Sequence, residues 1–426
     1  MKVFKFGGAS VKDADSVKNL VDILKIFGNE KIVIVISAMG KMTNAFEKLT
    51  GVFFNKQDTS ESFNFIKKFH IEIAKKLFSV KEHIIYHELS DIFSSLETYF
   101  KKEPSQDYDF EYDQIVSNGE IISTKIVSAY LNDAGINCQW LDARDLIKTD
   151  NNYRDAKINW QLTQEQSKKN ILPLFSNKKS IVLTQGFIGR ASDGNSTTLG
   201  REGSDYSAAI IAYSLDAEEV IIWKDVSGVL NADPKWFDET IKLEQISYHD
   251  AIELAYYGAT IIHPKTIKPL QNKQIPLFVR SFIKPEEQGT IIKDDITTLK
   301  VPSFIFKVNQ VLITISPKDF SFIVEENLRD IFHIFTEMKI KINVMQNSAI
   351  RFSVCVDHDE RRLPPLISKL KEKFKVLYNS GLELITIRHY DQNTIDRVCV
   401  EKEILLEQKS RTTVQLVVKP QKVIGQ

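Results

Sequence analysis

The amino-acid sequence predicts an α/β protein in which a doubly wound, largely parallel sheet is followed by a smaller C-terminal module. The chain opens with an apolar strand, a helix and a second apolar strand, and both strands end on small residues and glycine. In doubly wound sheets, ligands bind beyond the carboxyl ends of the strands, where these glycines lie. After about residue 300 the pattern changes to short strands and amphipathic helices, which indicates a separate unit.

The first strand is predicted over VFKFGG (3–8). An amphipathic helix follows over 13–29, with an apolar face and Gly28 as its end. The apolar face comprises Val17, Leu20, Val21 and Leu24. The second strand, KIVIVISAMG (31–40), is apolar without interruption, which is typical of a parallel strand that is buried on both faces.

The central part of the chain continues the alternation of helices and strands. We expect helical structure over 60–102, an exposed acidic loop over 106–114, a helix over 117–131, a buried strand over 178–189, a helix over 204–215 and a strand at the start of 219–234. The remainder of 219–234 is rich in turn residues, and the loop between 189 and 204 is rich in glycine.

The C-terminal module shows the order βαββαβ over about 75 residues, which fits a ferredoxin-like fold. Its predicted elements are strands over 308–316, 341–346, 349–357 and 375–381 and helices over 322–338 and 362–374. Two further strand candidates, LELITIRHY (382–390) and TTVQLVVK (412–419), fill the remaining segment.

Composition excludes several classes of protein. The 56 basic and 56 acidic residues cancel, so no overall field attracts the chain to nucleic acid or to a membrane surface. The apolar run IVIVI (32–36) is far too short to cross a bilayer, which takes about 20 residues. We expect no signal segment, and the three widely spaced cysteines fit a reducing cytoplasm.

Three glycine-containing stretches at strand ends suit phosphate binding. They are KFGG (5–8), SAMG (37–40) and TTLGREGSD (197–205). Backbone amides of such loops can cradle phosphate oxygens. Phosphoryl transfer mainly requires positioning and neutralisation of charge. Lys5 supplies a positive charge, while Asp205 suits either Mg²⁺ ligation or an ordering network.

A second set of residues suits an amino acid. The two parallel donors of Arg201 match a carboxylate, and Glu120, just after Gly119, can accept from an ammonium group. Ser37 and Thr43 can donate to carboxylate oxygens. No residues suggest a Ser–His–Asp or Cys–His centre.

In their order along the chain, these motifs resemble the aspartate kinases of the amino-acid kinase family. The resemblance is carried by KFGGAS (5–10), SAMGKMTN (37–44), SNGEIIS (117–123), LDAR (141–144), QGFIG (185–189), TTLGREGSDYSA (197–208), WKDVSGVLNADP (223–234), ISYHDAIELAYYGATIIHPKT (246–266) and IPLFVRSFIKPEEQGT (275–290). It implies the carbamate kinase-like fold of this family, followed by ACT modules.

The resemblance implies ATP-dependent phosphorylation of the side-chain carboxylate of L-aspartate, with Mg²⁺, as the first step of lysine, threonine and methionine biosynthesis. It assigns catalysis to Lys5, Gly8 and Asp205. It assigns aspartate binding to Ser37, Thr43, Glu120, Arg201 and Ser204. It assigns nucleotide binding to Gly7, Lys224, Asp225, Asp233 and Lys235. It implies no dedicated cluster of metal ligands.

The resemblance also implies a domain organisation and a regulatory site. An amino-acid-binding lobe (1–180), a nucleotide-binding lobe (181–300), an ACT domain (305–380) and a short second ACT-like segment (381–426) are expected. An amino-acid effector, lysine or threonine, would contact Lys318, Phe320, Asn343, Asn347 and Ser348. Pairing of ACT modules implies a homodimer or a higher homo-oligomer.

The chain departs from the usual family pattern at several positions. Ala9 replaces a threonine, Lys224 a threonine, Leu230 a tyrosine, Lys235 an arginine, Thr260 a nucleotide-contacting lysine, and Ala349 a glutamate. The lysine that is absent at Thr260 and present at Lys224 suggests that one replacement compensates for the other. Two other functions stay open: a kinase for glutamate or N-acetylglutamate, and a non-catalytic amino-acid sensor.

Overall fold

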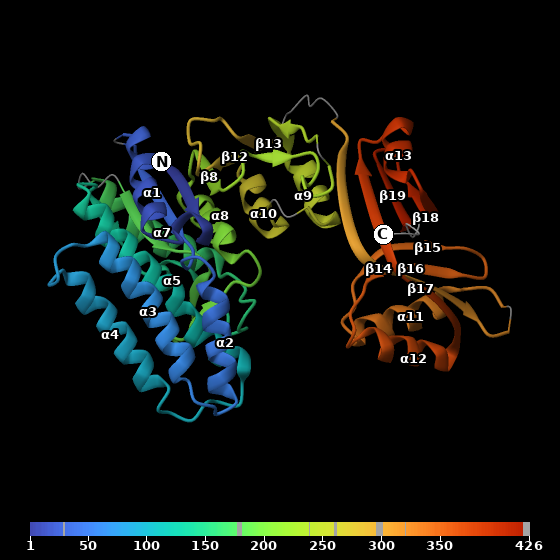
Figure 1. Cartoon of the computed structure of the whole chain (residues 1–426), viewed down its shortest axis with the longest axis horizontal. Helices are drawn as coiled ribbons and strands as arrows, with labels where there is room; N and C mark the ends of the chain where they lie inside the picture. Colours follow the sequence, from blue (N-terminus) through green and yellow to red (C-terminus); the bar gives the residue numbers. More distant parts are fainter. Residues whose placement is uncertain are drawn as a thin grey trace, which may run out of the picture. The chain divides into compact units, whose positions relative to one another are not determined.

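The computed structural model describes residues 1–28, 30–176, 181–237, 239–259, 262–294, 301–319 and 321–420. The chain divides into two units (Figure 1). Unit 1 comprises Met1–Val229, Lys242–Ile252 and Ile261–Thr298. Unit 2 comprises Leu230–Ile241, Glu253–Thr260 and Leu299–Gln426.

The centre of unit 1 is an eight-stranded sheet with the order β11-β13-β12-β8-β1-β2-β5-β3. Its strands are β1 (Lys2–Phe6), β2 (Ile32–Ile36), β3 (Cys138–Trp140), β5 (Ile181–Gln185), β8 (Glu219–Lys224), β11 (Gln245–Ser247), β12 (Leu277–Ser281) and β13 (Thr290–Lys293). β8, β1, β2 and β5 are parallel neighbours, so their carboxyl ends lie along one edge. The predicted doubly wound sheet is confirmed, and β13 adds an antiparallel strand beside β12.

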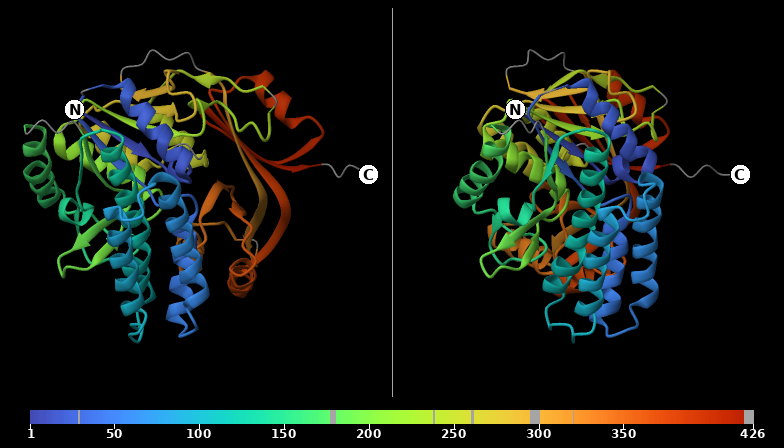
Figure 2. Two further views of the ribbon diagram at one scale, coloured as in Figure 1. Left: turned by 60° about the vertical axis from the view of Figure 1, so that its left-hand side comes forward. Right: turned by 90° about the vertical axis from the view of Figure 1, so that its left-hand side faces the viewer.

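Helices surround this sheet. They are η1 (Gly8–Val11), α1 (Ala14–Ile26), α2 (Met42–Phe54), α3 (Ser60–Leu77), α4 (Ile84–Tyr99), α5 (Tyr108–Asp133), α6 (Ala143–Leu146), α7 (Trp160–Ser176), α8 (Gly203–Leu215), α10 (Pro264–Asn272) and the first half of α9 (Tyr248–Tyr257), whose residues from Glu253 belong to unit 2. The helices α2 to α5, blue to teal in Figure 2, pack alongside one another. Two small sheets complete the unit's strands: β4 (Lys148–Thr149), β6 (Ile188–Ala191) and β7 (Ser196–Thr198), and the pair β9 (Val229–Leu230) and β10 (Lys242–Leu243).

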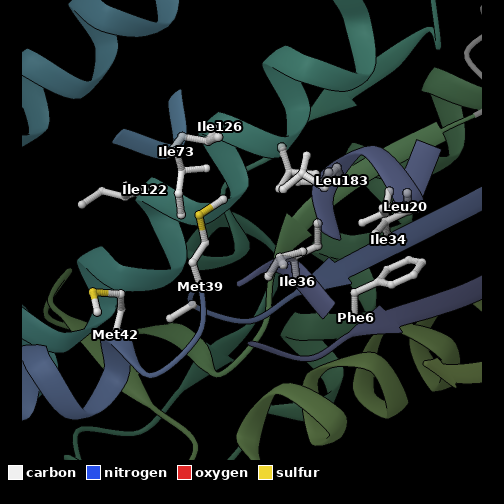
Figure 3. Packing of buried hydrophobic residues seen from close by; sticks show 14 of the residues in the cluster. Phe6, Leu20, Ile34, Ile36, Met39, Met42, Ile73, Ile122, Ile126 and Leu183 are labelled. Carbon is white, nitrogen blue, oxygen red and sulfur yellow. The ribbon is translucent and has the colours of Figure 1, made fainter. Parts of the chain in front are cut away.

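The first helix forms as its sequence predicts. Asp13 caps α1 by accepting a hydrogen bond from the Ser16 N–H at 2.8 Å, which satisfies a donor that the helix leaves unpaired. The predicted apolar face is buried, and Leu20 packs with Phe6, Ile34 and Leu183 in the main core (Figure 3). Every residue of β2 is buried, as its unbroken apolar sequence requires.

The prediction of an exposed acidic loop over 106–114 was wrong. These residues lead into α5, which Asp107 caps through the N–H groups of Asp109 and Phe110. Acidic residues in a first turn, here Asp109 and Glu111, interact favourably with the helix dipole. Glu111 and Asp113 are buried and have hydrogen-bond partners. Glu111 accepts from the Tyr99 hydroxyl at 2.6 Å, and Asp113 accepts from the Thr198 hydroxyl at 2.6 Å.

Unit 2 contains a six-stranded antiparallel sheet with the order β15-β16-β14-β17-β19-β18. Its elements are β14 (Ser303–Pro317), α11 (Glu325–Glu337), β15 (Ile342–Asn347), β16 (Phe352–Asp357), α12 (Leu363–Lys373), β17 (Phe374–Arg388), α13 (Gln392–Cys399), β18 (Lys402–Lys409) and β19 (Thr413–Pro420). From β14 to β17 the order is the predicted βαββαβ. The long strands β14 and β17 pair along most of their length, so two half-modules share them.

Each half of this sheet has its own core. α11 and α12 pack on the half that contains β15 and β16. α13 packs on the half that contains β19.

The segment 230–241 also belongs to the core of unit 2. The ring of Phe237 lies 4.9 Å from that of Phe304, and the ring of Trp236 stacks on Phe306 at 5.9 Å. The Asn231 side-chain amide donates to the Pro302 carbonyl at 2.9 Å. These contacts attach a segment from the middle of the sequence to strand β14.

Candidate active site

A cavity of about 550 Å³ lies at the carboxyl edge of the parallel strands of unit 1. Its lining comes from the ends of β1, β2, β5 and β8, from α2 and α5, from the loop before α8 and the first turn of α8, and from Arg154 in the segment between β4 and α7. The lining residues are Lys5, Gly8, Ser37, Ala38, Gly40, Thr43, Tyr112, Glu120, Arg154, Phe187, Gly200, Arg201, Glu202, Gly203, Ser204, Asp205 and Lys224. A cavity of this size suits a small-molecule ligand.

Two lysines and one aspartate form the charged end of the cavity. The Lys5 Nζ lies 2.6 Å from the Asp205 Oδ1, and the Lys224 Nζ lies 3.8 Å from the Asp205 Oδ2. Burial alone would raise the pKa of Asp205, but the charges of Lys5 and Lys224 outweigh it and hold that pKa below its usual range. Asp205 therefore stays ionised and fixes two ammonium groups beside the cavity.

Glycine is required where loops meet beside this cavity. A Cβ at Gly8 would lie 2.6 Å from the Gly40 carbonyl oxygen and 2.8 Å from the Ala38 carbonyl oxygen. Both obstacles are backbone atoms, so the ends of β1 and β2 can approach this closely only with glycine at position 8. The Gly40 N–H also donates to the Gly8 carbonyl at 2.9 Å.

Glu120 places a buried carboxylate against the end of β2. Its Oε1 accepts from the Ala38 N–H at 3.3 Å, while its Oε2 is buried and has no hydrogen-bond partner. Burial raises the pKa of Glu120 to about 8. The Ser123 hydroxyl, one turn further along α5, donates to the Ser37 carbonyl at 2.8 Å and so ties this loop to the helix. An unpartnered buried carboxylate is suited to a positively charged ligand group.

The loop that carries Arg201 is anchored by Asp113. This fully buried carboxylate accepts from the Thr198 N–H at 2.8 Å and from the Thr198 hydroxyl at 2.6 Å. Gly200 follows with φ 75°, and an aspartate oxygen, Asp155 Oδ1, would lie 2.7 Å from a Cβ at Gly200. Arg201 itself is exposed and lines the cavity.

Most of the predicted site residues line this one cavity: Lys5, Gly8, Ser37, Thr43, Glu120, Arg201, Ser204, Asp205 and Lys224. Gly7 lies next to it, because a Cβ at Gly7 would be 3.3 Å from the Lys5 Nζ. Asp225, Asp233 and Lys235 are exposed and do not line it. Asp233 and Lys235 belong to unit 2, and Thr260 lies outside the described residues.

Three further residues line the cavity although the sequence did not predict them: Tyr112, Arg154 and Phe187. Tyr112 precedes Glu120 on α5 by eight residues, a spacing that falls within one broad helical stripe, and a correct start for α5 would have revealed it. Phe187 falls inside the strand predicted over 178–189, but β5 ends at Gln185, so Phe187 lies beyond the strand end. Arg154 lies in the turn-rich segment DNNYRD, which carries no recognisable signal.

The candidate effector residues have different environments. The Lys318 Nζ donates to the Glu372 carbonyl at 2.8 Å. Asn343 accepts from the Lys307 Nζ at 3.0 Å and donates to Gln310 and Asp357, so its side chain is engaged. Asn347 and Ser348 are exposed at the end of β15. Phe320 lies outside the described residues, and the effector site stays a prediction.

Other features of the described part of the chain concern metals and membranes. It contains no group of three or more His, Cys, Asp or Glu side chains that could hold a metal ion. No helix in these ranges is long and apolar enough to cross a membrane. Cys138, Cys355 and Cys399 are not joined in disulfides.

Comparison with known proteins identifies relatives along most of the chain. The aspartokinase 1 of Arabidopsis thaliana, a chloroplastic protein, is 32% identical over 366 residues, which are 83% of this chain and 63% of the relative. The lysine-sensitive aspartokinase 3 of Escherichia coli K12 is 29% identical over 83% of this chain and 78% of the relative. The chain thus spans somewhat under two thirds of the length of its plant relative.

Solved structures show the same fold. Escherichia coli aspartokinase III in complex with lysine and aspartate has a TM-score of 0.82 at 25% identity, covering 99% of this chain and 96% of the other. The same enzyme in complex with aspartate and ADP has a TM-score of 0.80 at 26% identity over the same shares. The model of the amino acid kinase family matches residues 1–281, which include every residue that lines the cavity. The chain therefore belongs to the amino acid kinase family.

Proposed function

We propose that this protein is an aspartate kinase, which transfers the γ-phosphoryl group of ATP to the side-chain carboxylate of L-aspartate and releases 4-phospho-L-aspartate and ADP. The observation that carries the proposal is the composition of the cavity. Lysines fixed by Asp205 stand at strand ends suited to phosphates, and Glu120 and Arg201 line the same space. The Escherichia coli relative in complex with aspartate and ADP supports this pair of ligands.

Lys5 and Lys224 are assigned to the phosphates. Both ammonium groups are held beside the cavity by Asp205, so they need little reorganisation when negative charge develops on the transferring group. The close approach at Gly8 leaves backbone amides at the strand end without covering side chains. Catalysis then consists of holding the aspartate carboxylate in line with the γ-phosphorus.

The amino-acid end of the cavity distinguishes the groups of aspartate. Arg201 suits the α-carboxylate because its guanidinium can form two parallel hydrogen bonds. Glu120 suits the α-ammonium group, which would supply the partner that its buried Oε2 lacks. Ser37, Thr43 and Ser204 line the same space and can donate to carboxylate oxygens.

Mg²⁺ would neutralise charge on the β- and γ-phosphates. In the described part of unit 1, Asp205 is the acidic group at the phosphate end, and it is already paired with two lysines. A Mg²⁺ ion that takes most of its ligands from ATP and water fits this arrangement better than an all-protein cage. We therefore assign Asp205 to the ordering of Lys5 and Lys224.

An assay for acyl phosphate tests the proposed function directly. The protein is incubated with ATP, Mg²⁺ and L-aspartate, and the product is trapped with hydroxylamine; parallel reactions contain glutamate or N-acetylglutamate. We expect hydroxamate from aspartate. Product from glutamate or N-acetylglutamate alone would favour a different carboxylate kinase, and no product from folded protein that binds an amino acid would favour a sensor.

Lys224→Met tests the assignment of this lysine to the nucleotide. We expect the KM for ATP to rise about tenfold or more, because a charge-assisted contact is worth about 1.5–3 kcal/mol, while the KM for aspartate changes much less. Steady-state kinetics with each substrate varied in turn provide the measurement.

Lys284→Met is a suitable control for this variant, because Lys284 is exposed in unit 1 and does not line the cavity. It should leave both KM values unchanged. Equal increases in the two KM values for Lys224→Met would contradict the assignment.

We further propose that unit 2 regulates the enzyme as a pair of ACT modules, with the ACT domain at 305–380 and a shorter second module at 381–426. Residues 1–180 and 181–300 would form the amino-acid and nucleotide lobes. The lysine-bound relative supports an amino-acid effector, and lysine, threonine and methionine are the candidates to add to the assay.

The edge strands β15 and β18 suit pairing between subunits of a homo-oligomer. Cysteines that are not joined in disulfides fit a cytoplasmic enzyme.

A further inference from the structure

Three non-glycine residues with left-handed backbone line the candidate active site. They are Arg154 with φ 64°, Phe187 with φ 69° and Glu202 with φ 55°. Such conformations are uncommon for residues with a side chain, and they cluster at functional sites where the surrounding structure holds them in place. Arg154 has no part in the phosphate or aspartate assignments above, so its position requires a separate explanation.

The backbone of Arg154 is anchored beside the loop that carries Arg201. The Arg154 N–H donates to the Asp113 Oδ2 at 3.0 Å, and the same carboxylate binds Thr198. The next residues continue alongside this strand, since the Ala156 N–H donates to the Thr198 carbonyl at 3.0 Å. The Arg154 carbonyl oxygen would lie 3.3 Å from a Cβ at Gly200. Arg154 therefore adjoins the amino-acid end of the cavity.

The side chain of Arg154 is also fixed. Its guanidinium carbon lies 4.2 Å from the centre of the Tyr112 ring, and Tyr112 is buried and lines the same cavity. Its Nη1 lies 3.3 Å from an Asp109 oxygen and its Nη2 3.4 Å from a Glu47 oxygen. Contacts with α2 and α5 thus hold this side chain from three directions.

The two carboxylates decide between two roles for Arg154. An arginine that receives a substrate carboxylate needs positive charge to spare, as exposed Arg201 has. The charge of Arg154 is already balanced by Asp109 and Glu47, which would repel an approaching anion. The Arg154 guanidinium lies over the Tyr112 ring and is paired with two carboxylates. It is therefore better suited to limit the space of the cavity than to bind an anion.

We infer that Arg154, stacked on Tyr112, forms the end wall of the amino-acid part of the cavity and limits the substrate to the length of aspartate. This inference rests on the proposed function. With the α-carboxylate held by Arg201 and the reacting carboxylate near Lys5, a substrate longer by one methylene group must displace the Arg154 guanidinium from its contacts with Tyr112, Asp109 and Glu47. A difference of one methylene group is worth about 10–200-fold in specificity.

Arg154→Gly tests the wall with little disturbance of the backbone, because glycine adopts positive φ readily and keeps the N–H that binds Asp113. We expect the ratio of kcat/KM for glutamate to that for aspartate to rise at least about tenfold. Calorimetric titration of both amino acids in the absence of ATP should show the same change in the ratio of Kd values.

Lys56→Gly is the matched control. Lys56 also has a left-handed backbone, with φ 56°, but it does not line the cavity, so its replacement should leave the ratio unchanged. Arg154→Met keeps a long side chain without the planar group, and we expect a smaller rise in the ratio. If the glycine variant fails to fold, the methionine variant provides the test.

An unchanged ratio in a folded Arg154 variant would overturn the inference. It would also be overturned if affinity for aspartate fell tenfold without any gain for glutamate, because Arg154 would then bind a carboxylate directly. Failure of the proposed function has a different signature, namely that the unaltered protein phosphorylates neither amino acid. In that case the calorimetric ratio still tests the wall.

Discussion

Lys5→Met should lower kcat for aspartyl phosphate formation by about 10²–10³-fold, the usual loss when one preorganised group that stabilises transition-state charge is removed. Lys5 lies at the end of β1, and its ammonium group is 2.6 Å from the Asp205 carboxylate at the phosphate end of the cavity. Methionine has a similar length but no charge. The hydroxamate assay at saturating ATP and aspartate measures the loss.

Loss of folding must be separated from loss of catalysis in this variant. Removing one partner of a buried ion pair costs about 3–5 kcal/mol of stability, although Lys224, 3.8 Å from Asp205, should reduce that penalty. Adding Asp205→Asn removes the buried carboxylate that has lost Lys5, so the double variant should regain part of the stability in urea unfolding without regaining activity. Lys2→Met, in the same strand but outside the cavity, should retain activity. A folded Lys5→Met enzyme with kcat within threefold of the unaltered enzyme would exclude Lys5 from catalysis.

Glu120→Gln should weaken aspartate binding by about 10–100-fold, the range expected when a charge-assisted hydrogen bond to an ammonium group is lost. Glutamine keeps the shape of the side chain and can still accept from the Ala38 N–H. It cannot supply the negative charge. Because Glu120 is assigned to the substrate and not to the phosphates, the KM for ATP should change far less than the Kd for aspartate.

The pH dependence of binding provides a second readout for Glu120. Burial raises the pKa of Glu120 to about 8, so this carboxyl group is largely protonated at pH 7 in the empty enzyme. An arriving ammonium group favours the ionised form, and binding should therefore release up to about one proton. Aspartate affinity should rise with pH up to about 8. Calorimetry at pH 7 in buffers with different ionisation enthalpies measures the released proton.

Stability should follow the opposite trend in the empty enzyme. The folded-state pKa of Glu120 lies above the value of 4.5 for an unperturbed glutamate, so between these values the folded protein retains a proton that the unfolded chain has lost. The contribution of Glu120 to the free energy of unfolding is therefore fully present below about pH 4.5, and it is lost as the pH rises towards 8. Glu120→Gln should remove this contribution to the decline.

Glu111→Gln is the control for both readouts, because Glu111 is buried on the same helix but does not line the cavity. It should retain the proton release. If Glu120→Gln binds aspartate with unaltered affinity and releases the same proton, Glu120 is not the ammonium acceptor.

The sequence predicted those features of the fold that depend on neighbouring residues, such as apolar runs, glycines and periodicity. The unbroken apolar run of β2 required burial on both faces, and glycines at the strand ends marked the edge at which the cavity lies. The βαββαβ order was legible from helical and strand periodicity. The start of α5 was not, because its acidic first turns look like solvent-exposed loop until Asp107 is seen to cap them and Thr198 and Tyr99 to satisfy the buried carboxylates.

Site residues that belong to a continuous sequence motif could be predicted. Residues that only tertiary contacts bring to the cavity could not. Lys5, Glu120 and Arg201 stand in recognisable segments. Arg154 became visible only through its backbone bond to Asp113 and its contact with Tyr112, which join residues about 40 positions apart. The exposed Asp233 and Lys235 belong to a segment whose packing on β14 no local pattern indicates.

The assignment of 230–241 to unit 2 has a consequence for how this protein can be divided or recombined. A chain cut after residue 298 would retain Trp236 and Phe237 but lose Phe304 and Phe306, the rings on which they pack. The shortened protein would carry uncovered aromatic surface on the segment that directly follows Val229. The C-terminal part of the chain therefore cannot be exchanged by itself for that of a relative. A graft between relatives needs to carry 230–241 and 253–260 along with everything beyond 299, and any gradual evolutionary replacement of the unit would have had to change these stretches together.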